Sequence, residues 1–158
     1  MATVKQTPYE RTQVPIGVTK NQIEEMLVKA GALAIQWTTT PNAIMGKECP
    51  ILQFAIETVL KGASQKYVIK LQPPLLEKES GRGYNKTHVP NMNASMRLLH
   101  WYVKSKLEAI EYGLEDFVEA FMPKILILLP DGTTSTVSDA LKSRPQIFSQ
   151  VFMIPESD

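Results

Sequence analysis

The sequence predicts one α+β domain over residues 1–158, with a mainly antiparallel sheet of about four or five strands packed against one long helix and two or three shorter ones. Three segments in the first half alternate apolar and polar residues with a period of two, which is typical of strands with one buried face. Two other segments repeat apolar residues at helical spacing. The length suits one domain that buries its core without a disulfide or a metal.

The first predicted helix has clear start and stop signals. Residues 1–11 are expected to form a loose N-terminal arm, followed by a short edge strand over 12–18. Thr19 is the predicted N-cap, with Gln22 completing a capping box three residues later. Gly31 lies where a helix-ending residue adopts a positive φ.

Three antiparallel strands are predicted next. Their alternation indicates one face buried against the helices and one polar outer face. A turn over 61–64 joins the second strand to the third. The predicted buried-face residues are Leu33, Ile35, Trp37, Leu52, Phe54, Ile56, Tyr67, Ile69 and Leu71.

The second half opens with a predicted long polar loop over residues 75–92. A structureless loop of this length is uncommon unless it is functional or mobile. The longest helix is predicted over 93–112, where Gly113 ends it, with a buried apolar stripe along one side. The apolar run 125–129 is predicted to be a central strand. A short helix is predicted to follow, with Asp116 in its first turn and with Phe117 and Phe121 facing inward. After a turn over 130–132, a last helix is predicted over 135–143, capped by Thr136 or Ser138. The apolar tail over 145–158 is predicted to pack on the domain.

Composition narrows the classes of function. Seventeen Lys and Arg residues against 16 Asp and Glu leave a formal net charge of +1, so any contact with nucleic acid or membrane must come from a local patch. The single cysteine, Cys49, excludes an intrachain disulfide and fits a reducing compartment. No segment approaches the roughly 18 apolar residues of a membrane span. We therefore expect a cytoplasmic protein without a membrane partner.

Signatures of enzymes are missing from the sequence. It contains no glycine-rich phosphate loop, no nucleophile elbow and no clustered zinc ligands. Four carboxylates near the end of the long helix could bind a divalent cation, but a solvated helix face with Lys104 and Glu108 paired is the favoured interpretation. These carboxylates are Glu108, Glu111, Glu115 and Asp116. The sequence therefore predicts a protein that is not an enzyme and has no cofactor and no metal.

Two groups of residues are candidates for binding nucleic acid. In the polar loop, Arg82 and Lys86 supply charge and Tyr84 offers a ring face, although a solvated flexible loop is the alternative. On the long helix, Arg97, His100 and Lys104 share one face beside Trp101. The alternative there is that Trp101 packs on the sheet while the cations extend into water. A loop folded toward the helix would join both groups into one patch.

Charge separation along the helices supports a rival hypothesis. The basic residues precede an acidic stretch over 108–119, and such a separation suits self-association. A homo-oligomer is therefore a second expected state.

Residues 104–133 read as a K-x-K-L-E-A-x-x-x-G helix, then F-x-x-x-F, then an L-P-D-G-x-T turn. This motif resembles that of a group of small uncharacterised proteins of bacteriophages and related mobile elements. This chain departs from the pattern at Pro123, Lys124 and residues 133–136. The resemblance transfers no catalytic residue, and it implies a role in replication, recombination or interference with host defence.

Together these observations predict a non-catalytic protein that binds single-stranded DNA or RNA in replication or recombination. The alternative is a homo-oligomeric or partner-binding protein, such as an inhibitor of a host-defence factor.

Overall fold

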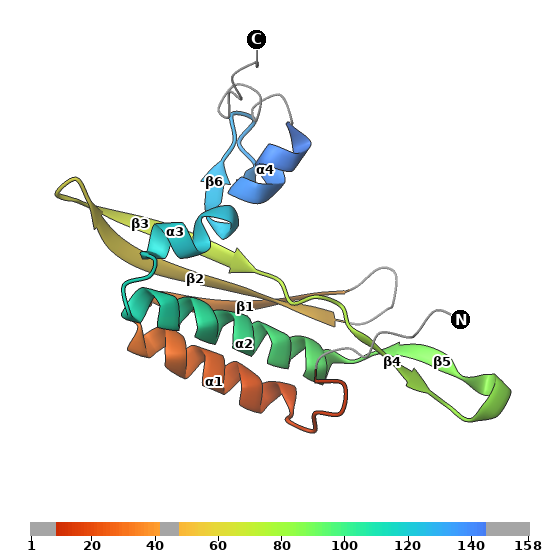
Figure 1. The fold of residues 1–158 in the computed structure, drawn as a ribbon. Helices are drawn as coiled ribbons and strands as arrows, with labels where there is room; N and C mark the ends of the chain where they lie inside the picture. Colours follow the sequence, from red (N-terminus) through yellow and green to blue (C-terminus); the bar gives the residue numbers. More distant parts are fainter. Residues whose placement is uncertain (1–8, 42–47, 145–158) are drawn as a thin grey trace, which may run out of the picture.

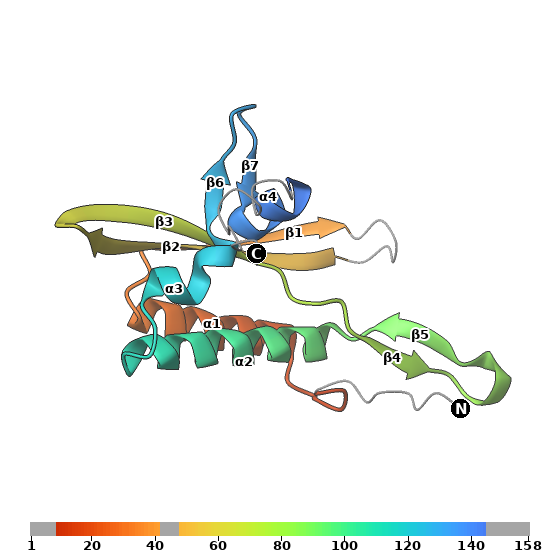
Figure 2. The same ribbon diagram turned by 45° about the horizontal axis from the view of Figure 1, so that its top comes forward.

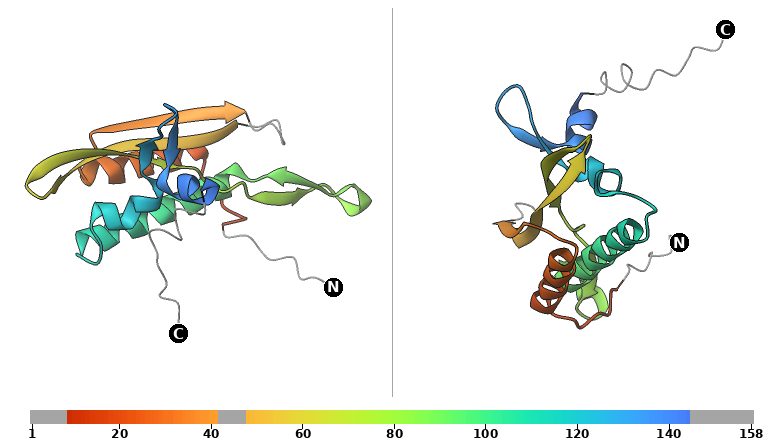
Figure 3. Two further views of the ribbon diagram at one scale, coloured as in Figure 1. Left: turned by 90° about the horizontal axis from the view of Figure 1, so that it is seen from above. Right: turned by 90° about the vertical axis from the view of Figure 1, so that its left-hand side faces the viewer.

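A three-stranded antiparallel sheet with two helices on one face forms the body of the molecule (Figures 1 and 3). The computed structural model describes residues 9–41 and 48–144. The sheet has the order β1-β2-β3, and both helices run in the same direction beneath it. The predicted α+β class is therefore confirmed. The elements of this body are α1 (Ile16–Lys29), β1 (Ala34–Pro41), β2 (Glu48–Leu60), β3 (Ala63–Leu71) and α2 (Met92–Glu111).

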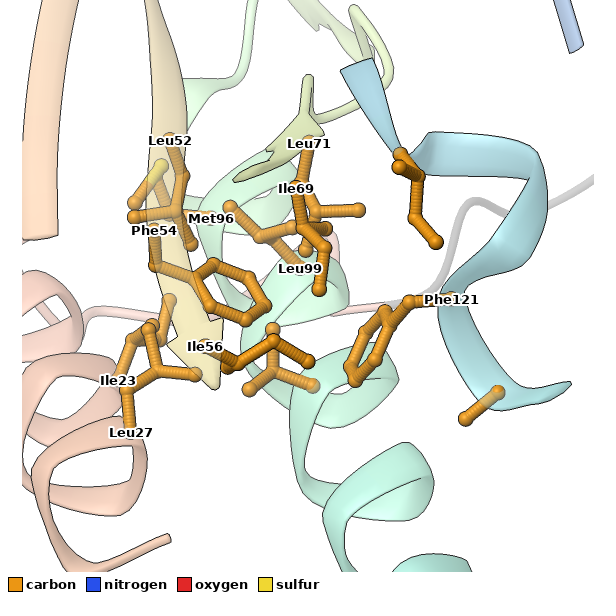
Figure 4. Packing of buried hydrophobic residues seen from close by; sticks show 13 residues of the cluster. Ile23, Leu27, Leu52, Phe54, Ile56, Ile69, Leu71, Met96, Leu99 and Phe121 are labelled. Carbon is orange, nitrogen blue, oxygen red and sulfur yellow. The ribbon is translucent and has the colours of Figure 1, made fainter. Parts of the chain in front are cut away.

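The core lies between the sheet and the two helices (Figure 4). The period-two alternation puts Leu52, Phe54 and Ile56 of β2 on the helix side, as the sequence predicted. The apolar stripe predicted on α2 is confirmed as well, because Met96, Leu99 and Val103 are buried. From the helices and the segment that follows α2, the core cluster takes Ile23, Leu27, Met96, Leu99, Val103, Ala120, Phe121 and Ile125.

The start of α1 differs from the prediction. The helix begins at Ile16 after Pro15, whose φ of −63° suits the N-cap position. The backbone N–H of Thr19 donates to the Pro15 carbonyl, so the segment predicted as an edge strand over 12–18 has no strand: residues 12–15 are irregular and residues 16–18 belong to the first helical turn. Thr19 is inside the helix and not its N-cap, and its buried Oγ1 has no hydrogen-bond partner among the described residues. The predicted capping box with Gln22 is therefore wrong. Residues 1–8 of the expected N-terminal arm lie outside the described residues.

The connection over 75–92 contains a β-hairpin, where the sequence predicted a loop. Strand β4 (Glu77–Ser80) pairs antiparallel with β5 (Thr87–Pro90), and the 3-10 turn η1 (Gly83–Asn85) lies at the tip. Gly81 has a φ of +106°, and a Cβ at this position would clash with the Asn85 carbonyl oxygen. The hairpin extends from the N-terminal end of α2 away from the body (Figures 1 and 2).

A smaller unit follows α2 along the chain. The side chain of Asp116 accepts from the Glu119 backbone N–H at 2.8 Å and caps the helix α3. The turn predicted over 130–132 is confirmed, and so is the predicted Thr136 cap of the last helix. The expected central strand is wrong: β6 makes its ladder with β7, and only Ile125 bridges to Ile69 of β3. Leu128 of β6 is 74% exposed. Residues 145–158, predicted to pack as an apolar tail, lie outside the described residues. The elements are α3 (Phe117–Phe121), η2 (Met122–Lys124), β6 (Leu126–Leu128), β7 (Thr134–Thr136) and α4 (Val137–Ser143).

Candidate functional site

Helix α2 presents the first candidate group, which we call the helix cluster and which consists of Arg97, His100, Trp101 and Lys104. The helix begins at Asn91, whose side chain accepts from the Ala94 backbone N–H at 3.3 Å. The buried side of α2 fixes its rotation, because Leu99 and Val103 pack in the core. Residues on the opposite side of the helix therefore face solvent.

Trp101 lies on the solvent side of α2. Its side chain is 55% exposed, so the alternative in which it packs on the sheet is wrong. Tryptophan is a large apolar residue that is well buried on average in folded proteins. An exposed indole between two cations on one helix face is therefore the most unusual surface feature of α2.

The cations of the helix cluster have no acidic partner in the part of the chain that the structure describes. The Arg97 guanidinium donates to the Gln22 side-chain oxygen of α1 at 2.6 Å, which is a neutral partner. Over residues 9–41 and 48–144, no carboxylate lies within ion-pair distance of Arg97 or Lys104, so the expected Lys104–Glu108 pair is absent. Partial burial lowers the pKa of His100, and the charges of Arg97 and Lys104 lower it further. The charges of Arg97 and Lys104 therefore both disfavour the protonated form of His100.

The tip of the β4–β5 hairpin presents the second group, the hairpin cluster of Arg82, Tyr84 and Lys86. All three side chains are exposed, and the Tyr84 ring is fully open to solvent. Lys86 lies 3.8 Å from the Glu79 carboxylate across the hairpin, so it is partly neutralised. Arg82 therefore carries most of the available charge at this tip.

The two clusters do not form the single patch that the sequence suggested. Trp101 lies about 14 Å along α2 from Met92, at about 1.5 Å per residue. Tyr84 lies up to about 20 Å beyond Pro90, at about 3.3 Å per strand residue. Since the hairpin points away from the helix (Figures 1 and 2), the clusters are separated by about 30 Å.

A groove between the C-terminal halves of α1 and α2 was not predicted. It encloses about 450 Å³, with an apolar floor and charged residues at its rim. Its lining comes from helices far apart in sequence, which is why pattern reasoning missed it. The only local signal was that Met26 and Ala30 continue the apolar side of α1. The lining residues are Met26, Lys29, Ala30, Lys104, Leu107, Glu108, Ile110, Glu111 and Phe117.

The carboxylates after Lys104 have mainly structural partners. Glu115 lies 3.8 Å from Lys106, and Asp116 caps α3. Within the described part of the chain, no group of three or more His, Cys, Asp or Glu residues is placed to hold a metal ion.

Comparisons of the chain with protein-family models, with curated proteins and with solved structures found no match. The resemblance to phage and mobile-element proteins therefore stays a prediction. In the described ranges, none of the helices has both the length and the apolar character that crossing a bilayer requires.

Proposed function

We propose that this protein binds single-stranded nucleic acid without catalysing a reaction, with the helix cluster as the main contact. The observation that carries the proposal is the exposed Trp101 beside two cations that no described carboxylate neutralises. An indole face stacks on a base of any sequence, and adjacent cations contact the phosphates on either side of it. The resemblance to mobile-element proteins makes replication or recombination the expected setting.

A single strand fits these residues better than a duplex. Unpaired bases can leave their stack and lie on an aromatic side chain, whereas the bases of a duplex are stacked inside it. The hairpin cluster repeats the same chemistry, with the exposed Tyr84 ring between Arg82 and Lys86. In this proposal one strand runs from the helix cluster to the hairpin tip.

Charge reversal tests the proposal. We expect Arg97→Glu combined with Lys104→Glu to abolish the binding of labelled oligonucleotides in fluorescence anisotropy, because two attractive contacts become repulsive. The matched control is Lys61→Glu combined with Lys142→Glu, which changes the net charge equally at two other exposed positions.

The control variant should bind as the unaltered protein does. If both double variants bind equally well, the helix cluster is not the site. If the unaltered protein binds no oligonucleotide at low salt, the proposed function is wrong.

The groove favours a second candidate function, the binding of a protein partner such as a host-defence factor. Its apolar floor of Met26, Leu107 and Phe117 is typical of a surface that receives an apolar side chain. Leu107→Ala removes part of this floor without adding a charge beside Lys104, which also lines the groove, so it should weaken such an interaction and leave oligonucleotide binding intact.

A further inference from the structure

No further strand of the described chain pairs with the β1 edge of the main sheet. Among the described residues β1 pairs with β2 alone, and in both views of Figure 3 no drawn element lies beyond it. The strand is eight residues long, which is above the usual length of a strand. A strand at the edge of a sheet presents unpaired backbone N–H and C=O groups to any extended chain.

The sequence of β1 lacks the features that normally protect an edge. Residues 34–41 contain no Lys, Arg, Asp or Glu, and the only proline, Pro41, is at the end of the strand. The opposite edge differs, because β3 carries Lys66 and Lys70 and forms a bridge from Ile69 to Ile125. Charged side chains and covering segments are the usual means of preventing edge pairing. One edge of this sheet is thus protected and the other is not.

The open strand is also held in place. The Trp37 indole N–H donates to the Glu24 carboxylate of α1 at 2.8 Å, and the Lys20 ammonium lies 5.2 Å from the centre of the ring. Two contacts from one helix therefore fix the middle of β1. A strand ordered before binding loses less conformational entropy when it pairs with another strand.

We propose that β1 pairs antiparallel with β1 of a second copy of this chain, so that the two sheets form one continuous six-stranded sheet. A two-fold axis perpendicular to the sheet, lying between the two copies of β1 at their midpoints, generates this pairing, and each copy then uses the same residues. The proposal is independent of the proposed function, since β1 lies in the sheet and the helix cluster lies on the solvent side of α2.

The charge pattern selects a second copy as the occupant of this edge. Symmetric pairing sets a strand against itself, so every charged residue near the axis meets its own copy, and like charges directly opposite destabilise a strand pair. A strand without charges avoids this repulsion, and β1 has no charged residue over 34–41. Recognition of a charged strand from another protein would instead require residues of the opposite charge on β1.

The mass of the full chain in solution, measured by light scattering during size-exclusion chromatography, tests the pairing. We expect a species of twice the 17.7 kDa chain mass. Gln36→Lys places a cation on each copy near the axis and should give the single-chain mass. The matched control Gln65→Lys adds the same charge to an exposed position of β3 and should leave the dimer intact.

Two results would overturn the inference. One is a single-chain mass for the unaltered protein throughout a dilution series. The other is a dimer that persists in Gln36→Lys, since the interface would then lie elsewhere. If Gln36→Lys loses its fold by circular dichroism, Thr38→Lys replaces it and is judged by the same masses.

Discussion

At the scale of single residues, the candidate site depends on Trp101 and its basic neighbours. Trp101 adds little to the fold, because more than half of its side chain is exposed. His100 contributes differently, since partial burial and the charges of Arg97 and Lys104 lower its pKa. These two residues allow binding to be tested separately from stability.

Trp101→Ala should weaken oligonucleotide binding by about 1–3 kcal/mol through the loss of one stacked base. The free energy of unfolding should change by less than about 0.5 kcal/mol, as is usual for exposed positions. Anisotropy titrations and urea denaturation measure the two quantities. Trp101→Phe keeps a ring and should recover part of the affinity. Unchanged affinity in Trp101→Ala would remove the indole from the site.

Protonation of His100 gives the helix cluster a third positive charge. Because burial and the two cations lower its pKa, the unfolded chain takes up this proton at a higher pH than the folded chain. The His100 contribution to stability is therefore present above the usual pKa of about 6.5, and it is lost as the pH falls through the lowered value.

Oligonucleotide affinity should change in the opposite direction and rise on acidification, since bound phosphates favour the charged imidazole. Titrations over a pH series compare the unaltered protein with His100→Gln. In His100→Gln the increase in affinity at low pH should be smaller, because the charge of the His100 imidazolium is missing. An identical pH profile in both proteins would contradict the assignment.

At the scale of elements, the period of the buried residues was a better guide than capping signals, since the capping box predicted at Thr19 is wrong. The alternation in β2 and β3 and the stripe of α2 were predicted correctly, because burial of one face imposes a period on the sequence. In the first strand Ile35 and Trp37 pack on the core as predicted, but Leu33 precedes β1 and is 54% exposed, so its predicted burial is wrong. The hairpin over 77–90 was missed because its strands are short, polar and exposed on both faces. The run 125–129 looked like a central strand, yet only the bridge of Ile125 joins it to the main sheet.

Gly81 controls the hairpin element. Gly81→Ala should disorder the tip, because alanine disfavours a φ of +106° and its Cβ clashes with the Asn85 carbonyl oxygen. Amide hydrogen exchange should rise over residues 77–90 and stay unchanged in α2. Lys78→Ala is the control, since it truncates an exposed side chain of the same hairpin at a residue that does not have a positive φ. Equal protection of the hairpin in both variants would contradict this account of the turn.

At the scale of the whole molecule, the structure separates two clusters that the sequence could only place in adjacent segments. The separation follows from the direction in which the hairpin leaves α2, and no local pattern encodes that direction (Figure 2). The groove between α1 and α2 was beyond prediction for a related reason, because it depends on how two distant helices pack. The distance between the clusters, about 30 Å, corresponds to about nine stacked nucleotides at 3.4 Å each.

The salt dependence of oligonucleotide binding, measured as a function of oligonucleotide length, tests the central claim most directly. Each phosphate contact with a single strand adds about −0.7 to the slope of log affinity against log salt concentration. Oligonucleotides shorter than about nine nucleotides should reach only Arg97 and Lys104 and give a slope of about −1.4. Longer ones should also reach Arg82 and Lys86 and approach about −2.8. Binding that does not depend on salt at any length would contradict the account.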